Sequence, residues 1–141
     1  MGNIVMKVSC ENSGLRNLEQ LRAQHAYAWR DKICTGKEGG RAVAKKVPAM
    51  IISNGFLGAL AFAIEDNGGP LTVFKAIINY LHEAKVDCGI TATEPDKFMD
   101  ELCAANADTL RAITSEAMAY LNYLRRFAKP GKDDANGNDR K

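Results

Sequence analysis

An uncharged stretch of 18 residues, 47–64, constrains the fold of this chain more than any other feature of its sequence. By length alone it reaches the lower limit for a helix that spans a bilayer. However, Pro48 lies near its start, and Ser53-Asn54-Gly55 would put polar and helix-weakening groups at the middle of the membrane. Two buried helices of a soluble protein, broken at Asn54-Gly55, explain the stretch better, so we expect no membrane span.

Helical spacing of apolar residues and helix-capping residues elsewhere predict an all-α fold of about five to six helices. The chain contains no alternating run long enough to predict a strand. The first expected helix is capped by Ser13-Gly14 and ends near Cys34, the second runs from Arg41, bends or restarts at Pro48 and ends at Asn54-Gly55, and the third covers 56–64. The fourth runs from Pro70 to about Ala84, and the fifth follows a capping box at 93–96 and ends near Ala105. The last and longest helix is capped by Asn106 and ends near Ala128.

The length and composition fit one ordinary globular domain. The chain has 141 residues, of which 46% are hydrophobic and 26% charged, which excludes wholesale disorder. We expect a flexible N-terminal segment over 1–12, a compact helical domain over 13–128 and a disordered tail over 129–141, where Pro, Gly, Asp and Asn dominate. The aromatic residues at helical spacing are expected in the core rather than at a binding surface; these are Tyr27, Trp29, Phe62, Phe74, Tyr120 and Phe127.

No motif for catalysis or metal binding stands out. His82-Glu83 lacks the second histidine that a zinc-binding helix would need, and His25 is expected to be a packed histidine rather than a ligand. The four cysteines have no C-x-x-C spacing, so we interpret them as free thiols that mostly fill small apolar gaps in a reducing cytoplasm. The sequence therefore predicts a cytoplasmic protein that is not an enzyme, with no cofactor, metal or small-molecule substrate.

The net charge is only +2, but the charges are unevenly distributed along the chain. Residues 1–64 carry nine Lys or Arg against four Asp or Glu, residues 65–110 carry three against nine, and residues 111–141 carry seven against four. Such asymmetry indicates one surface that attracts phosphate and another that repels it, although solvated helix surfaces give the same pattern. Basic side chains recur at helical spacing in two stripes, Lys37, Arg41, Lys45 and Lys46 on one helix, and Arg111, Arg125 and Arg126 on another.

Two blocks of sequence carry a resemblance to a known family. Residues 45–62 contain two lysines, a proline, an apolar turn, Asn-Gly and a helix that ends in Ala-Phe, while residues 114–128 form a closing helix. Both resemble the small α-helical subunit of the type III-B CRISPR Cmr effector complex, the fifth Cmr protein. Phe56 before Leu57 and Tyr123 in place of the usual Trp are departures from the family pattern. The signature residues are Pro48, Asn54, Gly55, Gly58 and Phe62.

The resemblance implies a non-catalytic subunit that stacks beside the crRNA-bearing backbone of the complex. Its implied partners are other Cmr subunits, namely the backbone subunit and neighbouring copies of itself, and the crRNA–target RNA, which it would contact mainly through phosphates. The basic residues of the two stripes are the expected contacts, provided that the stripes converge. An alternative is a self-associating adaptor that binds only protein, through the small residues around Gly55 and Gly58.

Overall fold

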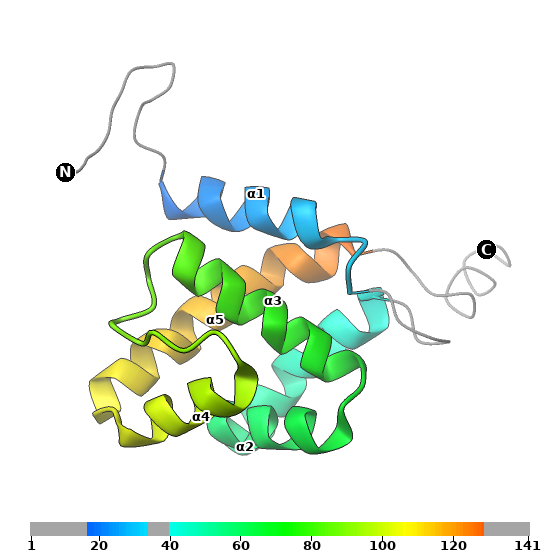
Figure 1. Ribbon diagram of the computed structural model, residues 1–141. Helices are drawn as coiled ribbons and strands as arrows, with labels where there is room; N and C mark the ends of the chain where they lie inside the picture. Colours follow the sequence, from blue (N-terminus) through cyan, green and yellow to red (C-terminus); the bar gives the residue numbers. More distant parts are fainter. Residues whose placement is uncertain (1–16, 34–39, 129–141) are drawn as a thin grey trace, which may run out of the picture.

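The computed structural model of the protein describes residues 17–33 and 40–128, which form five helices and no strand (Figure 1). The helices are α1 (Leu18–Trp29), α2 (Gly40–Asp66), α3 (Gly69–Glu83), α4 (Pro95–Ala104) and α5 (Ala107–Phe127). Helices α2, α3 and α5 pack against one another, α1 lies across α5 and α3, and α4 lies across α2 and α3 (Figure 1). The all-α prediction is confirmed. The expected terminal segments 1–12 and 129–141, together with Lys37, Cys10 and Cys34, lie outside the described residues.

The first helix begins later than the sequence predicts. Its N-cap is Asn17, whose side-chain oxygen accepts a hydrogen bond from the Gln20 backbone N–H at 2.9 Å. The Gln20 side chain accepts one from the Asn17 backbone N–H at 3.0 Å in return. This reciprocal capping box satisfies two backbone donors, which explains why α1 begins at Leu18; the predicted cap at Ser13-Gly14 lies outside the described residues. It also ends at Trp29, before the predicted end near Cys34.

The break within α2 lies at Gly55 and not at Pro48. Pro48 sits inside the helix, whereas Gly55 has φ 81° and ψ 162°, a combination that is nearly exclusive to glycine. A Cβ atom at Gly55 would meet no atom within 4 Å, so the backbone angle rather than crowding requires glycine there. The predicted break at Gly55 is confirmed, but the chain resumes helix immediately, and the helix does not restart at Pro48.

Within the described residues, α2 is the one helix long and apolar enough to cross a membrane by length and composition. Its interruption at Gly55 and its position in the bundle instead make it a core element. Side chains from both of its halves are fully buried against the other helices, among them Val43, Val47, Phe56 and Leu60. A backbone bent at mid-length does not suit a bilayer span.

The remaining helix ends are set by proline and asparagine. Pro70 and Pro95 lie in the first turns of α3 and α4, where a missing N–H costs nothing. The N-cap of α4 is Glu94, and no side chain caps it, so the predicted capping box at 93–96 is wrong. Asn106 does cap α5, because its side-chain oxygen accepts from the Thr109 N–H at 2.9 Å, as predicted.

Aromatic side chains form the two centres of the core. Phe56 contacts Phe74 edge-on at a ring-centre distance of 5.4 Å and lies 6.5 Å from Phe98, which joins α2, α3 and α4. Tyr80 and Tyr120 stack at 4.5 Å with planes 8° apart, which joins α3 and α5. Such pairs add to the stabilisation that burial of the rings provides.

Not every expected core residue is buried. Phe74 and Tyr120 are fully buried and Trp29 and Phe127 half-buried, but Tyr27 and Phe62 are 54% and 48% exposed. The prediction that these last two belong to the core is therefore wrong. The prediction that cysteines fill apolar gaps is also wrong at both described positions, because Cys88 and Cys103 are free and exposed. Periodicity places a side chain on a helix face, but it does not show whether another helix covers that face.

Candidate nucleic-acid interface

The structure brings part of the two basic stripes together at one end of the bundle. The Arg41 Nε atom donates a hydrogen bond to the backbone carbonyl of Ala128 at 3.3 Å, so the start of α2 touches the end of α5. Lys45 and Lys46 are exposed within the next turn and a half of α2, and Arg125 and Arg126 occupy the last turn of α5. We call Arg41, Lys45, Lys46, Arg125 and Arg126 the basic end.

Arg111 does not belong to the basic end. It lies in the second turn of α5, 14 residues before Arg125, which corresponds to about 21 Å along a helix. Its guanidinium also pairs with the neighbouring Asp108 carboxylate. The sequence placed Arg111 on the same helix face as Arg126, but a helix this long carries the two residues to opposite ends of the molecule.

The end of α1 adds a cation, Arg30, that the sequence analysis missed. Tyr27 contacts Phe127 edge-on at 5.5 Å, so the last turn of α1 lies beside the last turn of α5. The Arg30 guanidinium covers the exposed Tyr27 ring at 3.8 Å from its centre, and Lys32 follows in the next turn. The sequence signal was present in the basic residues at 30 and 32, but only the contact between Tyr27 and Phe127 shows that Arg30 lies near the basic end, whereas the Lys32 ammonium lies over Trp29.

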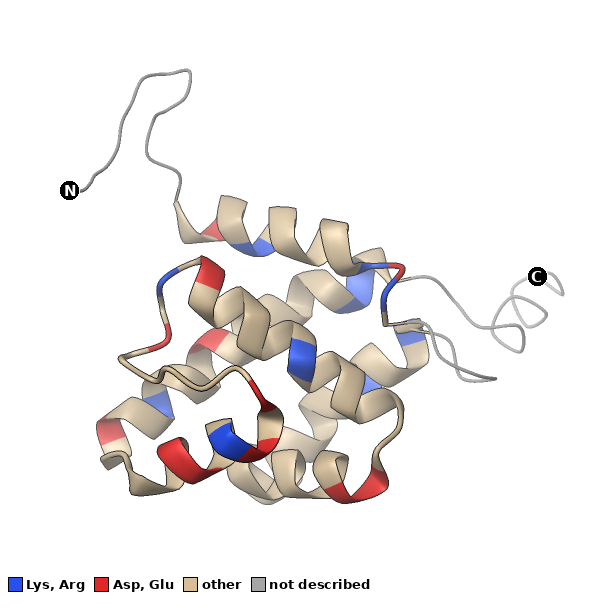
Figure 2. Cartoon of the chain, viewed as in Figure 1, with Lys and Arg blue, Asp and Glu red and all other residues tan. Residues whose placement is uncertain are grey.

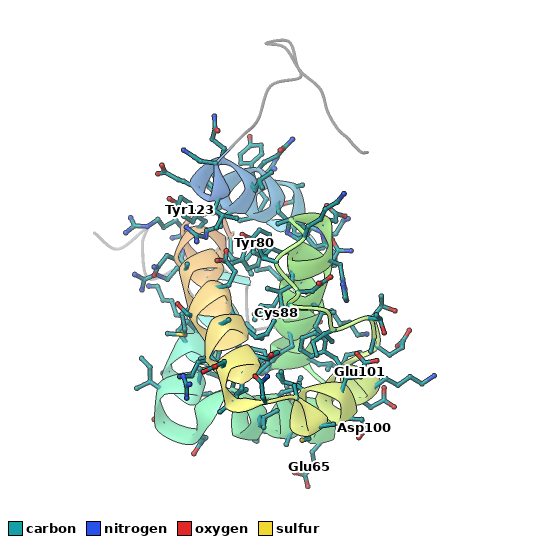
Figure 3. The ribbon with its side chains drawn as sticks, turned by 90° about the vertical axis from the view of Figure 1, so that its left-hand side faces the viewer. Glu65, Tyr80, Cys88, Asp100, Glu101 and Tyr123 are labelled. Carbon is teal, nitrogen blue, oxygen red and sulfur yellow. The ribbon has the colours of Figure 1, made fainter. Side chains whose placement is uncertain are left out.

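Apart from Asp31, which lies between Arg30 and Lys32, most exposed acidic residues gather away from this end (Figure 2). They come from the end of α2, from α4 and from the first turn of α5, and Figure 3 shows Glu65 and Asp100 far from Tyr123. The acidic end, as we name it, consists of Glu65, Asp66, Asp96, Asp100 and Asp108, all exposed. Nearby, Glu101 accepts hydrogen bonds from the Thr91 and Ala92 backbones, which lower the pKa of its carboxyl. The uneven charge distribution along the chain thus becomes, in the folded protein, a separation between a basic end and an acidic end.

A polar network holds α1 against α3 and α5. Arg22 donates to the Glu116 carboxylate from Nε at 2.8 Å and from Nη2 at 3.0 Å, and the Tyr80 hydroxyl donates to the same carboxylate at 2.5 Å. Figure 3 shows Tyr80 between α3 and α5, beneath α1. Burial alone would raise the pKa of the Glu116 carboxyl, but the hydrogen bonds from Arg22 and Tyr80 outweigh it and keep that pKa below its usual value.

His25 is the second node of this network. Its Nε2 lies 2.6 Å from the Asn79 side-chain oxygen and its Nδ1 lies 2.7 Å from the Tyr120 hydroxyl. Because the amide oxygen only accepts, Nε2 carries a proton and donates to Asn79, and in the neutral imidazole Nδ1 accepts from the Tyr120 hydroxyl. Burial lowers the pKa of His25, which favours that same form. As predicted, His25 is a packed histidine.

The signature residues surround the kink of α2 and face solvent. Asn54, Gly55, Gly58 and Phe62 are all exposed, Pro48 is half-buried, and Ile52 on the first half of the helix is 75% exposed. Exposed apolar side chains on both sides of a kink are what a protein contact surface offers. Among the described residues, no group of three or more His, Cys, Asp or Glu could hold a metal ion.

The described residues form a compact all-α body with a polarised charge distribution, which places the protein in the class of small all-helical domains. The family model described as CRISPR-associated protein (Cas_Cmr5) matches residues 18–130, nearly the whole helical body. The chain belongs to this family of small subunits of the type III-B CRISPR Cmr complex. No curated protein and no solved structure shows a significant match to it.

Proposed function

We propose that this protein is a non-catalytic small subunit that supports binding of guide and target RNA within the Cmr complex in antiviral defence. The observation that carries the proposal is the contact between Arg41 and the Ala128 carbonyl. It gathers Lys45, Lys46, Arg125 and Arg126 at one end, while the acidic end lies elsewhere. Cations concentrated on one surface favour an RNA backbone through release of its counterions, without reading bases.

The exposed apolar residues at the kink of α2 provide the proposed contact with other subunits, including the backbone subunit and neighbouring copies. Ile52 and Phe62 are 75% and 48% exposed, and Gly58 lets a partner backbone approach closely. Lys37, outside the described residues, and Arg111, at the other end of α5, remain separate candidates for RNA contact. The exposed thiols Cys88 and Cys103 suit a reducing compartment such as the cytoplasm.

The proposal is tested by the salt dependence of binding to a fluorescein-labelled single-stranded RNA, followed by fluorescence anisotropy with the full chain. Lys45→Gln/Lys46→Gln removes two charges from the basic end, and Lys85→Gln/Lys97→Gln removes two charges outside it. Each lost phosphate contact reduces the slope of log affinity against log salt by about 0.7 for single strands, so the first variant should lose about 1.4 and the control nothing. Equal slopes in all three proteins would exclude Lys45 and Lys46 from the RNA path.

A second candidate function is the self-associating adaptor that binds only protein, which the exposure of Ile52 and Phe62 also favours. Purification of the tagged chain from cells at moderate salt separates the two. Recovery of Cmr subunits together with short RNAs supports the subunit function. Recovery of other proteins without RNA supports the adaptor.

A further inference from the structure

The half-buried Trp29 at the end of α1 lies between two hollows in the surface. One hollow, of about 390 Å³, lies between α1 and the last turns of α3, and the other, of about 300 Å³, lies between α3 and the start of α4. Trp29 lines both. Each hollow is large enough for a small organic group such as a nucleobase.

The indole ring is held in a fixed orientation. It stacks on the His25 imidazole with ring centres 5.6 Å apart and planes 14° apart. His25 is fixed in turn by Asn79 and Tyr120, so the ring below the indole cannot turn away without breaking two hydrogen bonds. The Lys32 ammonium lies 4.7 Å from the indole centre and is carried on an exposed, flexible side chain that can move aside. A ring fixed in advance loses little entropy when a ligand stacks on it.

The charged residues around Trp29 indicate which kind of ligand the hollows suit. Lys32 lines the first hollow and Lys75 the second, so a cation lies in each hollow beside the shared indole. Glu83 and Glu94 also line the hollows, one in each, and carboxylates accept hydrogen bonds from the exocyclic amines of bases. An aromatic surface with cations beside it and acceptors within reach suits single-stranded RNA, whose bases stack while its phosphates lie on the lysines.

We propose that Trp29 and the two hollows form a base-stacking subsite for single-stranded RNA, separate from the phosphate contacts of the basic end. This inference rests on the proposed RNA-binding function and adds to it a contact with bases. Arg30 connects the two regions, since it follows Trp29 directly and its guanidinium covers Tyr27, which contacts Phe127 at the end of α5.

Trp29 is the single tryptophan of the chain, so its fluorescence reports on this subsite alone. The full chain is titrated with a ten-nucleotide oligocytidylate, whose bases carry exocyclic amines, and, as a matched control, with inorganic polyphosphate of equal charge. Stacking of a base should quench the emission, whereas polyphosphate, which has no bases, should leave it unchanged. Equal quenching by both polyanions would overturn the subsite.

Variants separate this subsite from the basic end. In the anisotropy assay Trp29→Leu, which keeps an apolar side chain, should weaken RNA binding about 10-fold, as loss of one stacked base does, and Trp29→Phe about 2-fold. Neither should change the salt slope, because no phosphate contact is removed. Circular dichroism of both variants checks that the fold is kept.

The two proposals fail in different ways. RNA binding that depends on Lys45 and Lys46 but neither quenches Trp29 nor weakens in Trp29→Leu would overturn the subsite and leave the proposed function intact. Absence of any RNA binding by the full chain would overturn both. Quenching by a synthetic peptide of residues 1–16, with none by RNA, would overturn the RNA assignment and make the hollows a docking site for the protein's own N-terminal segment.

Discussion

The ion pair between Arg22 and Glu116 offers a direct test of how α1 is attached to the bundle. Their side chains are 22% and 12% exposed, between the extremes of a surface pair and a fully buried one. Breaking a buried pair costs about 3–5 kcal/mol, whereas surface pairs contribute about 0–1 kcal/mol. Glu116→Gln leaves Arg22 and the Tyr80 hydroxyl sharing one amide oxygen, so we expect the free energy of unfolding to fall by about 2–3 kcal/mol.

Urea denaturation at pH 7, followed by circular dichroism, measures this loss. In thermal denaturation, 2–3 kcal/mol corresponds to a fall in Tm of about 8–12 °C for a folded domain of this size. Glu65→Gln is the matched control, because it makes the same chemical change at an exposed carboxylate that has no hydrogen bond or ion pair with another residue of 17–33 or 40–128, and surface changes of this kind stay within about 0.5 kcal/mol.

A double-mutant cycle isolates the pair itself. Arg22→Gln and Glu116→Gln, measured singly and together, should give a coupling energy of about 1–3 kcal/mol, since the two side chains share two hydrogen bonds. A coupling energy below about 0.5 kcal/mol would refute the reasoning, as would a Glu116→Gln variant as stable as the Glu65→Gln control. Either result would mean that apolar packing alone attaches α1.

Three further predictions concern pH, the kink and the apolar surface. Because the pKa of His25 is lowered in the folded protein, the unfolded chain binds more protons, and stability is lost as pH falls from about 6.5 toward that lowered pKa. In His25→Gln the urea concentration at the midpoint of unfolding should therefore depend less on pH between pH 7 and pH 5. Gly55→Ala should lower the free energy of unfolding by about 1–3 kcal/mol, because alanine is strained at the positive φ of this position. In the control Gly58→Ala the new Cβ would lie 3.2 Å from the Asn54 Cβ, and the free energy of unfolding should change by no more than about 1 kcal/mol. Equal losses in the two variants would contradict the role of φ. Replacement of both Ile52 and Phe62 by Ser should change the Tm by no more than about 4 °C, because both side chains are exposed. It should reduce the recovery of Cmr subunits with the tagged chain. Unchanged recovery would rule out this surface as the contact.

Much of the fold could be predicted because its signals are local. The Asn106 cap, the first-turn proline Pro70 and the break at Gly55 depend on residues a few positions apart, and all three are confirmed. The failures arose where two local signals competed. Asn17 with Gln20 forms a reciprocal capping box that the sequence analysis did not weigh, and Pro48 is accommodated within a helix that the surrounding core stabilises.

The candidate site was less predictable because its assembly is not local. The basic residues were identifiable from their spacing, but which of them meet depends on how α1, α2 and α5 cross. Arg41 approaches the end of α5 across 87 positions of sequence, and Arg111 is separated from that end by the length of its own helix. The exposure of Tyr27 and Phe62 was hidden for the same reason, because an uncovered helix face has the same periodicity as a covered one.

Because the basic and acidic ends are separated, the charge that the described part of the molecule presents to a partner depends on the face that the partner approaches, although the net charge of the chain is only +2. A polyanion would turn the molecule before contact, so that collisions with the wrong face become rarer and productive association becomes faster. Two copies would attract when unlike ends meet and repel when like ends meet. Since mobile ions screen such forces beyond about 8 Å at physiological ionic strength, this orientation acts in the last step of encounter and weakens as salt is added.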